Sequence, residues 1–97
     1  MKRSKKMTKE MIRVVELSDK LKALSHPHRL SIVCGLLDHA SNVTGIQQQL
    51  GIPQPSVSAH LAKLKTAGII KGHRNGQEIN YTVVDKDAKM LVDSLFN

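Results

Sequence analysis

Aromatic residues are almost missing from this chain of 97 residues, which has no tryptophan, one tyrosine and one phenylalanine. A folded core must therefore be built from leucine, isoleucine, valine, methionine and alanine. A chain of this length accommodates one domain and is too short for two. Because so small a domain buries only a limited core, pairing with a second copy would add to its stability.

Cysteine and long apolar runs are equally scarce. The single cysteine, Cys34, cannot form an internal disulfide, which fits a protein of a reducing cytoplasm. The basic start MKRSKKMTKE is followed by no apolar segment, because charged residues interrupt the next stretch: Arg13, Glu16, Asp19 and Lys20. We therefore expect neither a signal peptide nor a transmembrane span, and a cytoplasmic protein without a membrane partner.

Acidic residues are missing from His39 through Gln77, although the chain has eight of them. The same span contains four basic residues: Lys63, Lys65, Lys71 and Arg74. The whole chain carries a formal charge of +7. An acid on a surface that contacts phosphates would be repelled, so a basic stretch without acids predicts a surface for nucleic acid.

Residues 1–7 are expected to form a flexible basic arm, and residues 8–97 a single folded domain. A first helix is predicted from Thr8, as its N-cap, to Leu24. Four residues of this helix repeat with the spacing of a coiled-coil seam: Val14, Leu17, Leu21 and Leu24. The helix has more apolar surface than a small core needs, which favours a dimer contact over core packing alone.

Two further helices are predicted next. Ser25 is the expected N-cap of the second helix, with Pro27 in its first turn and its end near His39. The third helix should be capped by Asn42 and stopped by Gly51, at a position that favours positive φ.

A fourth helix is predicted over residues 54–66, with Pro55 tolerated only in the first turn. Val57, Leu61 and Leu64 form its buried stripe. Two short helices joined by a turn with glycine are typical of a helix-turn-helix, whose second helix reads DNA in the major groove. Polar and small side chains off the stripe are the predicted DNA contacts of this recognition helix: Gln54, Ser56, Ser58, Ala59, His60 and Lys63.

A β-hairpin is predicted to follow, with strands over residues 69–74 and 77–84. The dipeptide Asn75-Gly76 favours a type I′ turn, in which both central residues have positive φ. A two-residue loop at this point would set His73 opposite Glu78.

The hairpin tip, residues 73–77, is the predicted wing. Arg74 and Gln77 are expected to contact DNA, with Arg74 on a phosphate or in the minor groove. An exposed turn that touches nothing is the alternative. Lys5 and Lys6 of the arm are expected to add phosphate contacts.

A last helix is predicted to begin after Asp85 as N-cap. Its inward residues are expected to be Ala88, Leu91, Val92 and Leu95, with Met90 and Phe96 left for a further contact. The whole order is four helices, two strands and a helix. This is a mainly α fold with a β-hairpin wing, the winged helix-turn-helix.

Three runs of sequence resemble a known family: LKALSHPHRLSIV, NVTGIQQQLGIPQPSVSAHLAKLKTAGII and KGHRNGQEINYTV. They are similar to the ArsR-type winged helix-turn-helix repressors over roughly residues 17–95. The most specific segment runs from Gln54 to Leu61. Pro53 stands where the family usually has serine, so the start of the recognition helix is expected to differ.

The resemblance implies a cytoplasmic homodimer that represses transcription. Its two recognition helices would enter successive major grooves of a two-fold-symmetric operator in double-stranded DNA, about 34 Å apart. The first and last helices would form the dimer interface, through Met11, Val14, Leu17, Leu21, Met90, Leu91, Leu95 and Phe96.

The usual metal sites of the family are not matched in this chain. Residues 40–44 contain neither cysteine nor histidine, and no histidine follows Asp85 and Asp87 on the last helix. His26 and His28 flank Pro27, with Cys34 on the helix beyond, and a soft-metal site there is one alternative. The other alternative is a structural role, which is more common for neighbouring histidines in a segment interrupted by proline. We therefore predict no metal and no cofactor, and the sequence does not identify an inducer.

Redox control through Cys34 is a further hypothesis, by way of a sulfenic acid or a mixed disulfide. The alternative is that Cys34 packs as a small apolar residue.

An enzyme is not expected, because the chain has no nucleotide-binding glycine-rich loop and no notable Ser/His/acid spacing. The alternative to a DNA-binding regulator is a winged-helix module that binds RNA or protein. RNA-binding surfaces usually expose aromatic residues, which are scarce in this chain.

Overall fold

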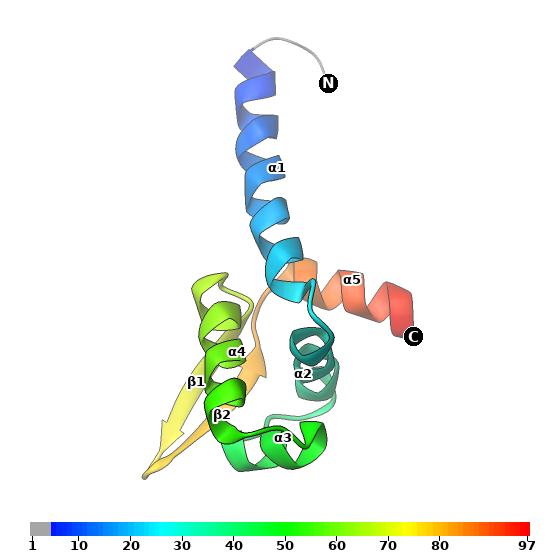
Figure 1. Ribbon diagram of the computed structural model, residues 1–97. Coiled ribbons are helices and arrows are strands. Elements are labelled where there is room, and N and C mark those ends of the chain that lie inside the picture. The colour runs from blue at the N-terminus through cyan, green and yellow to red at the C-terminus, as the bar shows by residue number, and fades with distance from the viewer. Residues whose placement is uncertain (1–4) are drawn as a thin grey trace.

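Four helices, a β-hairpin and a fifth helix follow one another in the computed structural model, which describes residues 5–97, with side chains from Thr8 onward. The elements are α1 (Lys5–Leu24), α2 (Pro27–Asp38), α3 (Val43–Leu50), α4 (Gln54–Thr66), β1 (Ile70–Asn75), β2 (Glu78–Val83) and α5 (Lys86–Phe96). Figure 1 shows the mainly helical winged helix-turn-helix that the sequence predicts. Within residues 5–97, none of the helices has both the length and the apolar character that crossing a membrane requires.

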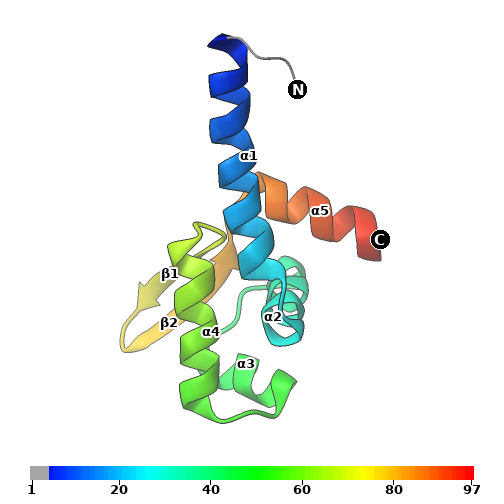
Figure 2. The same cartoon turned by 45° about the horizontal axis from the view of Figure 1, so that its top comes forward.

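The first helix is longer than predicted. It begins at Lys5, so Thr8 is not its N-cap, and residues 5–7 of the predicted arm are helical. The remainder of that arm lies outside the described residues. Figures 1 and 2 show α1 projecting far from the rest of the molecule. Its last turn is anchored in the core, while the more distant part exposes large apolar side chains: Met11, Ile12, Val14 and Val15.

The second helix is capped by His26 and not by Ser25. Nδ1 of the His26 ring accepts a hydrogen bond from the backbone N–H of His28 at 3.1 Å. Pro27 occupies the first turn, as predicted, where the missing N–H has no helical partner. The N-cap is therefore His26, and the prediction of Ser25 is wrong.

The third helix has the ends that the sequence predicts. Oδ1 of Asn42 accepts a hydrogen bond from the N–H of Gly45 at 2.8 Å. Gly51 ends the helix in the left-handed region, with a φ of 66°. This turn leads directly into α4, so the two helices form the predicted helix-turn-helix.

The fourth helix begins without a side-chain cap, because Pro53 at the N-cap position has no acceptor to offer. A missing cap costs about 1 kcal/mol. Val57, Leu61 and Leu64 are buried, and each such side chain contributes about 1.5–3 kcal/mol. Packing against the core therefore outweighs the missing cap and holds α4 in place.

The turn of the hairpin differs from the predicted one. Asn75 pairs with Glu78, and the loop residues are Gly76 and Gln77. Of these two loop residues, only Gly76 has positive φ, at 68°, which fits a type II′ turn instead of type I′. His73 consequently lies opposite Asn80, and the predicted pairing of His73 with Glu78 is wrong.

The last helix is capped as predicted, since Oδ2 of Asp85 accepts a hydrogen bond from the N–H of Ala88 at 2.9 Å. Ala88 and Val92 are buried, but Leu95 was wrongly predicted to face inward and is 66% exposed. The last turn of α5 extends beyond the packed body, so its apolar side chains find no cover within the chain (Figure 1).

The core is aliphatic, as the composition requires, apart from Tyr81. The second helix lies at its centre and contacts α1, α3, α4, α5 and β2. The most completely buried side chains come from four helices and the link before β1: Ile32, Val33, Ile46, Val57, Leu64, Ile69 and Val92.

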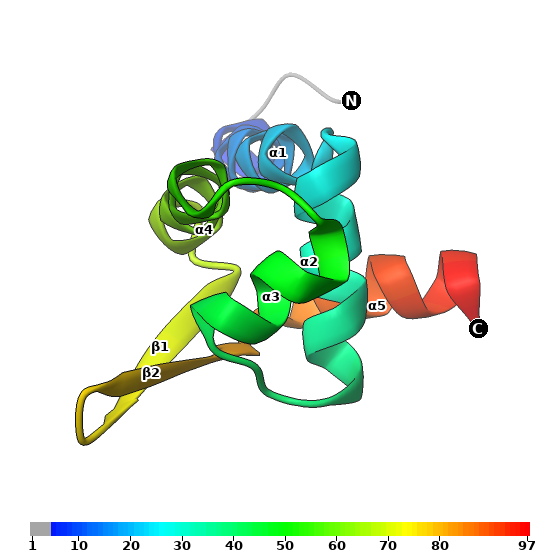
Figure 3. The same ribbon diagram turned by 60° about the horizontal axis from the view of Figure 1, so that its bottom comes forward.

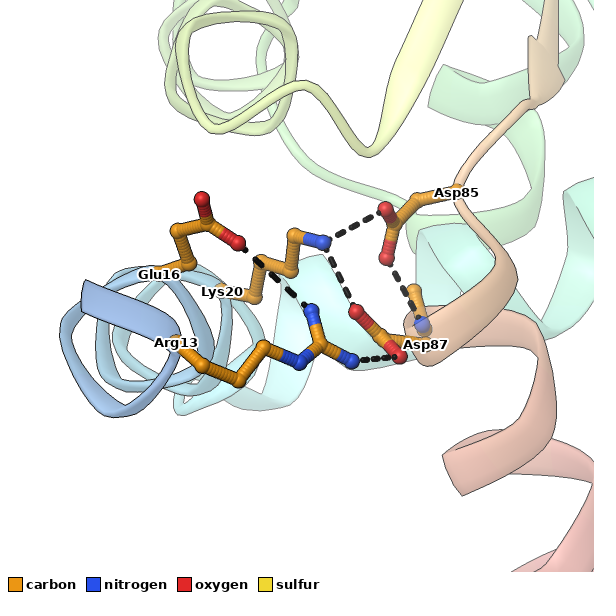
Figure 4. Close-up of polar contacts among 6 residues, drawn as sticks. Arg13, Glu16, Lys20, Asp85 and Asp87 are labelled. Carbon is orange, nitrogen blue, oxygen red and sulfur yellow. Dashed lines mark hydrogen bonds and ion pairs between the residues drawn. The ribbon is translucent and has the colours of Figure 1, made fainter. Parts of the chain in front are cut away.

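An ion-pair network ties α1 to the start of α5 (Figure 4). Nζ of Lys20 lies 2.8 Å from Oδ1 of Asp85 and 2.8 Å from Oδ2 of Asp87. Nη2 of Arg13 donates to Oδ1 of Asp87 at 2.8 Å. The hydrogen bond from Arg13, and next that from Lys20, lower the pKa of Asp87 to about 2. The network thus joins the middle of α1 to the start of α5.

Replacing Asp87 should alter the acid stability of the protein. Because the folded state lowers the pKa of this carboxyl from 3.8 to about 2, its stabilising effect is present above pH 3.8 and is lost as the pH falls through about 2. Asp87→Asn should therefore lower the unfolding temperature at neutral pH and flatten the loss of stability across that acid window. The control is Asp19→Asn, because Asp19 is an exposed acid of α1 that lies outside the network. An unchanged acid profile in Asp87→Asn would contradict this account.

Candidate nucleic-acid interface

The helix-turn-helix leaves most of α4 open to solvent. Figure 3 shows α3 and α4 joined by a short turn, with α4 beside the hairpin. The buried stripe of α4 faces the core, and Gln54, Ser58 and Ala59 are exposed. The open sides of α4 carry no acid, because none occurs between His39 and Gln77.

One flank of α4 carries Gln54 and Ser58, which are four residues apart and therefore neighbours on the helix surface. Lys65 falls on the same flank two turns further along and is also exposed. The sequence prediction did not include Lys65, although its spacing from Gln54 and Ser58 signals a shared flank. This flank offers an amide, a hydroxyl and a cation in one row.

The other flank of α4 carries Ser56, His60 and Lys63, spaced by four and three residues. It faces the junction of α1 and α2, where Ser56 and His60 are half-buried. Gln54 and His60 thus lie on different flanks, and the predicted contacts do not form a single row. Lys63 is exposed on the edge of this flank.

The His60 side chain is enclosed by polar groups from the start of α2. Its ring centroid lies 4.5 Å from that of His26 and 5.4 Å from that of His28. Nη1 of Arg29 lies 3.3 Å from Nδ1 of His60. Because arginine can only donate, Nδ1 is the acceptor and the ring proton sits on Nε2. Nε2 is therefore the atom of His60 that remains for another partner.

The surroundings of His26 and His60 lower the pKa of both rings and so favour their neutral forms. Burial is the largest cause that lowers the pKa of His60, followed by the charges of His26 and Arg29. Burial, and then Arg29 and His28, lower the pKa of His26. Neutral rings fit the geometry, since Nδ1 of each ring accepts a hydrogen bond.

Arg29 is the polar residue that joins three parts of the fold. Its side chain is buried, and Nε donates to the backbone oxygen of Ala23 at 2.6 Å. That carbonyl lies in the last turn of α1, where helix oxygens have no partner within the helix. Through Nη1 the same side chain reaches His60, so Arg29 connects α1, α2 and α4. No local sequence pattern indicates this contact, because Arg29 and His60 lie 31 residues apart in the chain.

The wing carries exposed Arg74 and Gln77 at the tip of the hairpin. The hairpin lies beside α4, as Figures 1, 2 and 3 agree. Glu78 is the first acid after the acid-free span, and Nδ2 of Asn42 donates to its carboxylate. Glu78 is thereby turned towards the start of α3, and the tip keeps its basic character.

The predicted dimer residues remain largely uncovered in the single chain. Six are exposed: Met11, Val14, Leu21, Met90, Leu95 and Phe96. Leu17 and Leu91 are half-buried along a groove of about 500 Å³ between α1 and α5. The side chains of Lys5 and Lys6 lie outside the part of the chain that the structure describes.

The surroundings of Asp85, Asp87 and Cys34 bear on the metal and redox hypotheses drawn from the sequence. Asp85 and Asp87 are paired with Lys20 and Arg13, so cations of the chain already occupy these carboxylates. Cys34 is half-buried, and burial, followed by the charge of Asp38, raises the pKa of its thiol. A raised pKa reduces the thiolate fraction, so these surroundings do not activate Cys34.

Replacing Arg29 by methionine should destabilise the fold. The backbone oxygen of Ala23 would lose its buried donor, which costs about 1–3 kcal/mol. The nearby exposed cation Lys63 provides the matched control, and Lys63→Met should change the free energy of unfolding by less than about 0.5 kcal/mol. Urea denaturation measures both variants. Equal stability of the two variants would argue against an anchoring role for Arg29.

Comparison with known proteins agrees with this geometry. The family model described as "Bacterial regulatory protein, arsR family" matches residues 26–71. The chain is 39% identical over 92 residues to the Biofilm growth-associated repressor of Xylella fastidiosa (strain Temecula1 / ATCC 700964), covering 93% of this chain and 81% of that protein.

Two solved structures share the fold and a substantial part of the sequence. The transcriptional repressor BigR from Xylella fastidiosa superposes with a TM-score of 0.82 at 37% identity, covering 93% of this chain and 92% of that one. The transcriptional repressor PagR of Bacillus anthracis gives a TM-score of 0.81 at 36% identity, covering 88% and 98%. These relatives are transcriptional repressors and not enzymes. The chain belongs to the ArsR family of bacterial regulatory proteins and is a DNA-binding transcriptional regulator.

Proposed function

We propose that the protein is a homodimeric repressor that binds a two-fold-symmetric operator in double-stranded DNA. The observation that carries the proposal is the acid-free polar surface of α4 beside a hairpin that has a basic tip. The names of the relatives, which are repressors, support repression as the outcome of binding. Because its target is DNA, the protein would act in the cytoplasm of a bacterium.

In this proposal α4 lies in the major groove and the wing follows the DNA backbone. Gln54 and Ser58 would read base edges, since a glutamine amide can bond two atoms of an adenine. Ala59 and Ser56 would permit close approach, and Lys63 would meet a phosphate. Arg74, Gln77, Lys5 and Lys6 would contribute contacts at the wing and at the start of α1. His60 would reach a base only through Nε2, because Nδ1 faces Arg29.

The proposed dimer buries the apolar surface that a single chain leaves exposed. Met90, Leu95 and Phe96 are each at least 60% exposed, and Leu21 is 50% exposed. Large apolar patches of this kind mark protein interfaces. A structural neighbour from Mycobacterium bovis, at 24% identity and a TM-score of 0.82, is described as a homodimeric winged helix-turn-helix DNA-binding domain. In a symmetric dimer the two copies of α4 would reach successive major grooves.

Selection of bound fragments from genomic DNA with the purified protein tests the proposed function. We expect recovered fragments to share a sequence with inverted repeats, and transcription from a promoter that contains it to fall when the protein is added. Recovery of fragments without any shared sequence would contradict an operator-specific regulator. Increased transcription would contradict repression but would leave operator-specific DNA binding in place.

Replacing Gln54 by alanine should weaken discrimination between the selected operator and random DNA by about 1–3 kcal/mol. The matched control is Gln49→Ala, because the Gln49 amide donates to the backbone oxygen of Ser31 and is held against α2. Fluorescence anisotropy with both duplexes measures the ratio of affinities. If Gln54→Ala weakened both duplexes equally, Gln54 would not be a base-reading residue.

Arg74→Ala gives a useful contrast, because a phosphate contact carries no base information. This variant should weaken binding to both duplexes alike and reduce the slope of affinity against salt concentration by about 1. A loss confined to the operator would instead indicate that Arg74 reads the minor groove.

Charge placed in the groove between α1 and α5 should separate the proposed dimer. Leu21 lines that groove, so Leu21→Glu places a carboxylate in it. The control is Val84→Glu, because Val84 is an apolar residue of similar exposure on the link before α5. We expect sedimentation to give a dimer for the native chain and for Val84→Glu, and a monomer for Leu21→Glu. Circular dichroism checks that both variants remain folded. A dimeric, folded Leu21→Glu variant would place the interface elsewhere.

A further inference from the structure

Three of the five histidines meet at the junction of α2 and α4. His26 and His28 come from the start of α2, and His60 comes from the middle of α4. One ligand atom of each residue lies within 4.8 Å of the others. All three rings are half-buried, so they are held in place and still accessible from solvent.

We propose that His26, His28 and His60 form a binding site for a divalent transition metal of the zinc type. Three imidazole nitrogens with one open position are a common ligand set for zinc, and imidazole also suits cobalt, nickel and copper. No carboxylate belongs to this group within the described residues, so the site would not suit magnesium or calcium. The site is separate from the carboxylates of α5, which are paired with Lys20 and Arg13.

The geometry requires only a small closure of the cluster. Zinc binds imidazole nitrogen at about 2.0–2.1 Å, so three ligands of a tetrahedron lie about 3.4 Å from one another. Atoms that now lie within 4.8 Å would have to approach by about 1.4 Å or less. Side-chain rotation and a slight shift of the half-buried His28 ring could supply this, because the described hydrogen bonds do not include its side chain.

Two hydrogen bonds would be given up when the metal binds. Nδ1 of His26 accepts from the N–H of His28, and Nδ1 of His60 accepts from Arg29. A neutral imidazole that binds metal through one nitrogen carries a proton on the other, so neither ring could ligate and keep its present bond. The metal would therefore release Arg29 from α4 and loosen the cap of α2.

Charge around the cluster limits which metals can bind tightly. Arg29 and Lys63 are the cations that face it, and both repel a metal ion. This repulsion weakens the binding of every divalent ion, so we expect useful affinity only for ions that bind imidazole strongly, such as zinc and copper. Release of Arg29 from His60 would reduce the repulsion at the site.

Metal titration of the purified full-length protein, prepared without a histidine tag, tests the proposal. His28→Gln removes one ligand and leaves the His26 cap and the contact between Arg29 and His60 intact. His39→Gln is the matched control, because His39 is exposed at the end of α2 and outside the cluster. We expect one zinc ion per chain for the native protein and for His39→Gln, and at least about a tenfold weaker affinity for His28→Gln.

Nuclear magnetic resonance of the native chain provides a second readout that needs no variant. Addition of zinc should shift the ring signals of His26, His28 and His60, and leave those of His39 and His73 in place. Equal zinc affinity of the two variants, no zinc binding by the native chain, or shifts confined to His39 and His73 would overturn the proposal. Because no DNA is present, these results do not depend on the proposed function.

Discussion

One stripe of α4 is packed into the core, and this packing sets the orientation of the helix. Val57, Leu61 and Leu64 have almost no exposed surface, and they hold a helix that has no side-chain cap. Because a helix has a fixed period, burying this stripe decides which residues face outward. The acid-free composition of the same segment then makes that outward surface suitable for a polyanion.

Arg29 and the three histidines give α4 a second, polar attachment. The buried guanidinium satisfies a carbonyl at the end of α1 and reaches the ring of His60. His60 is therefore tied to the body of the protein, while Gln54 and Ser58 on the opposite flank are free of such contacts. A change at the histidine cluster would act on α4 through a few defined bonds. This arrangement links the surface proposed for DNA to the site proposed for metal.

Much of the fold could be predicted from the sequence, because apolar spacing and end signals agree for most elements. Asn42, Gly51 and Asp85 end or begin helices as expected, and the stripe of α4 is the buried one. The errors arise where tertiary packing competes with local preference. The dipeptide Asn75-Gly76 favours a type I′ turn, yet the observed register sets Gly72 opposite Tyr81. A Cβ at Gly72 would lie 3.2 Å from the tyrosine ring and 2.7 Å from Cγ2 of Ile79, so this close approach requires glycine.

The candidate site was predictable in part. Composition and spacing identify the exposed residues of α4 and the wing, because those depend on helix period and turn position alone. The contact of His60 with Arg29 and its meeting with His26 and His28 join segments more than thirty residues apart, which no local pattern reports. The length of α1 was likewise underestimated, because Thr8 is a good cap residue but nothing stops the helix from continuing to Lys5.

A nuclear magnetic resonance titration of the full chain with its selected operator would show whether α4 and the wing contact DNA. The backbone amide signals of α4 and of the hairpin tip should change most, and those of the last turn of α5 should remain as in the protein without DNA. Changes centred on α5 or on the groove beside α1, with the amides of α4 unaffected, would contradict the account.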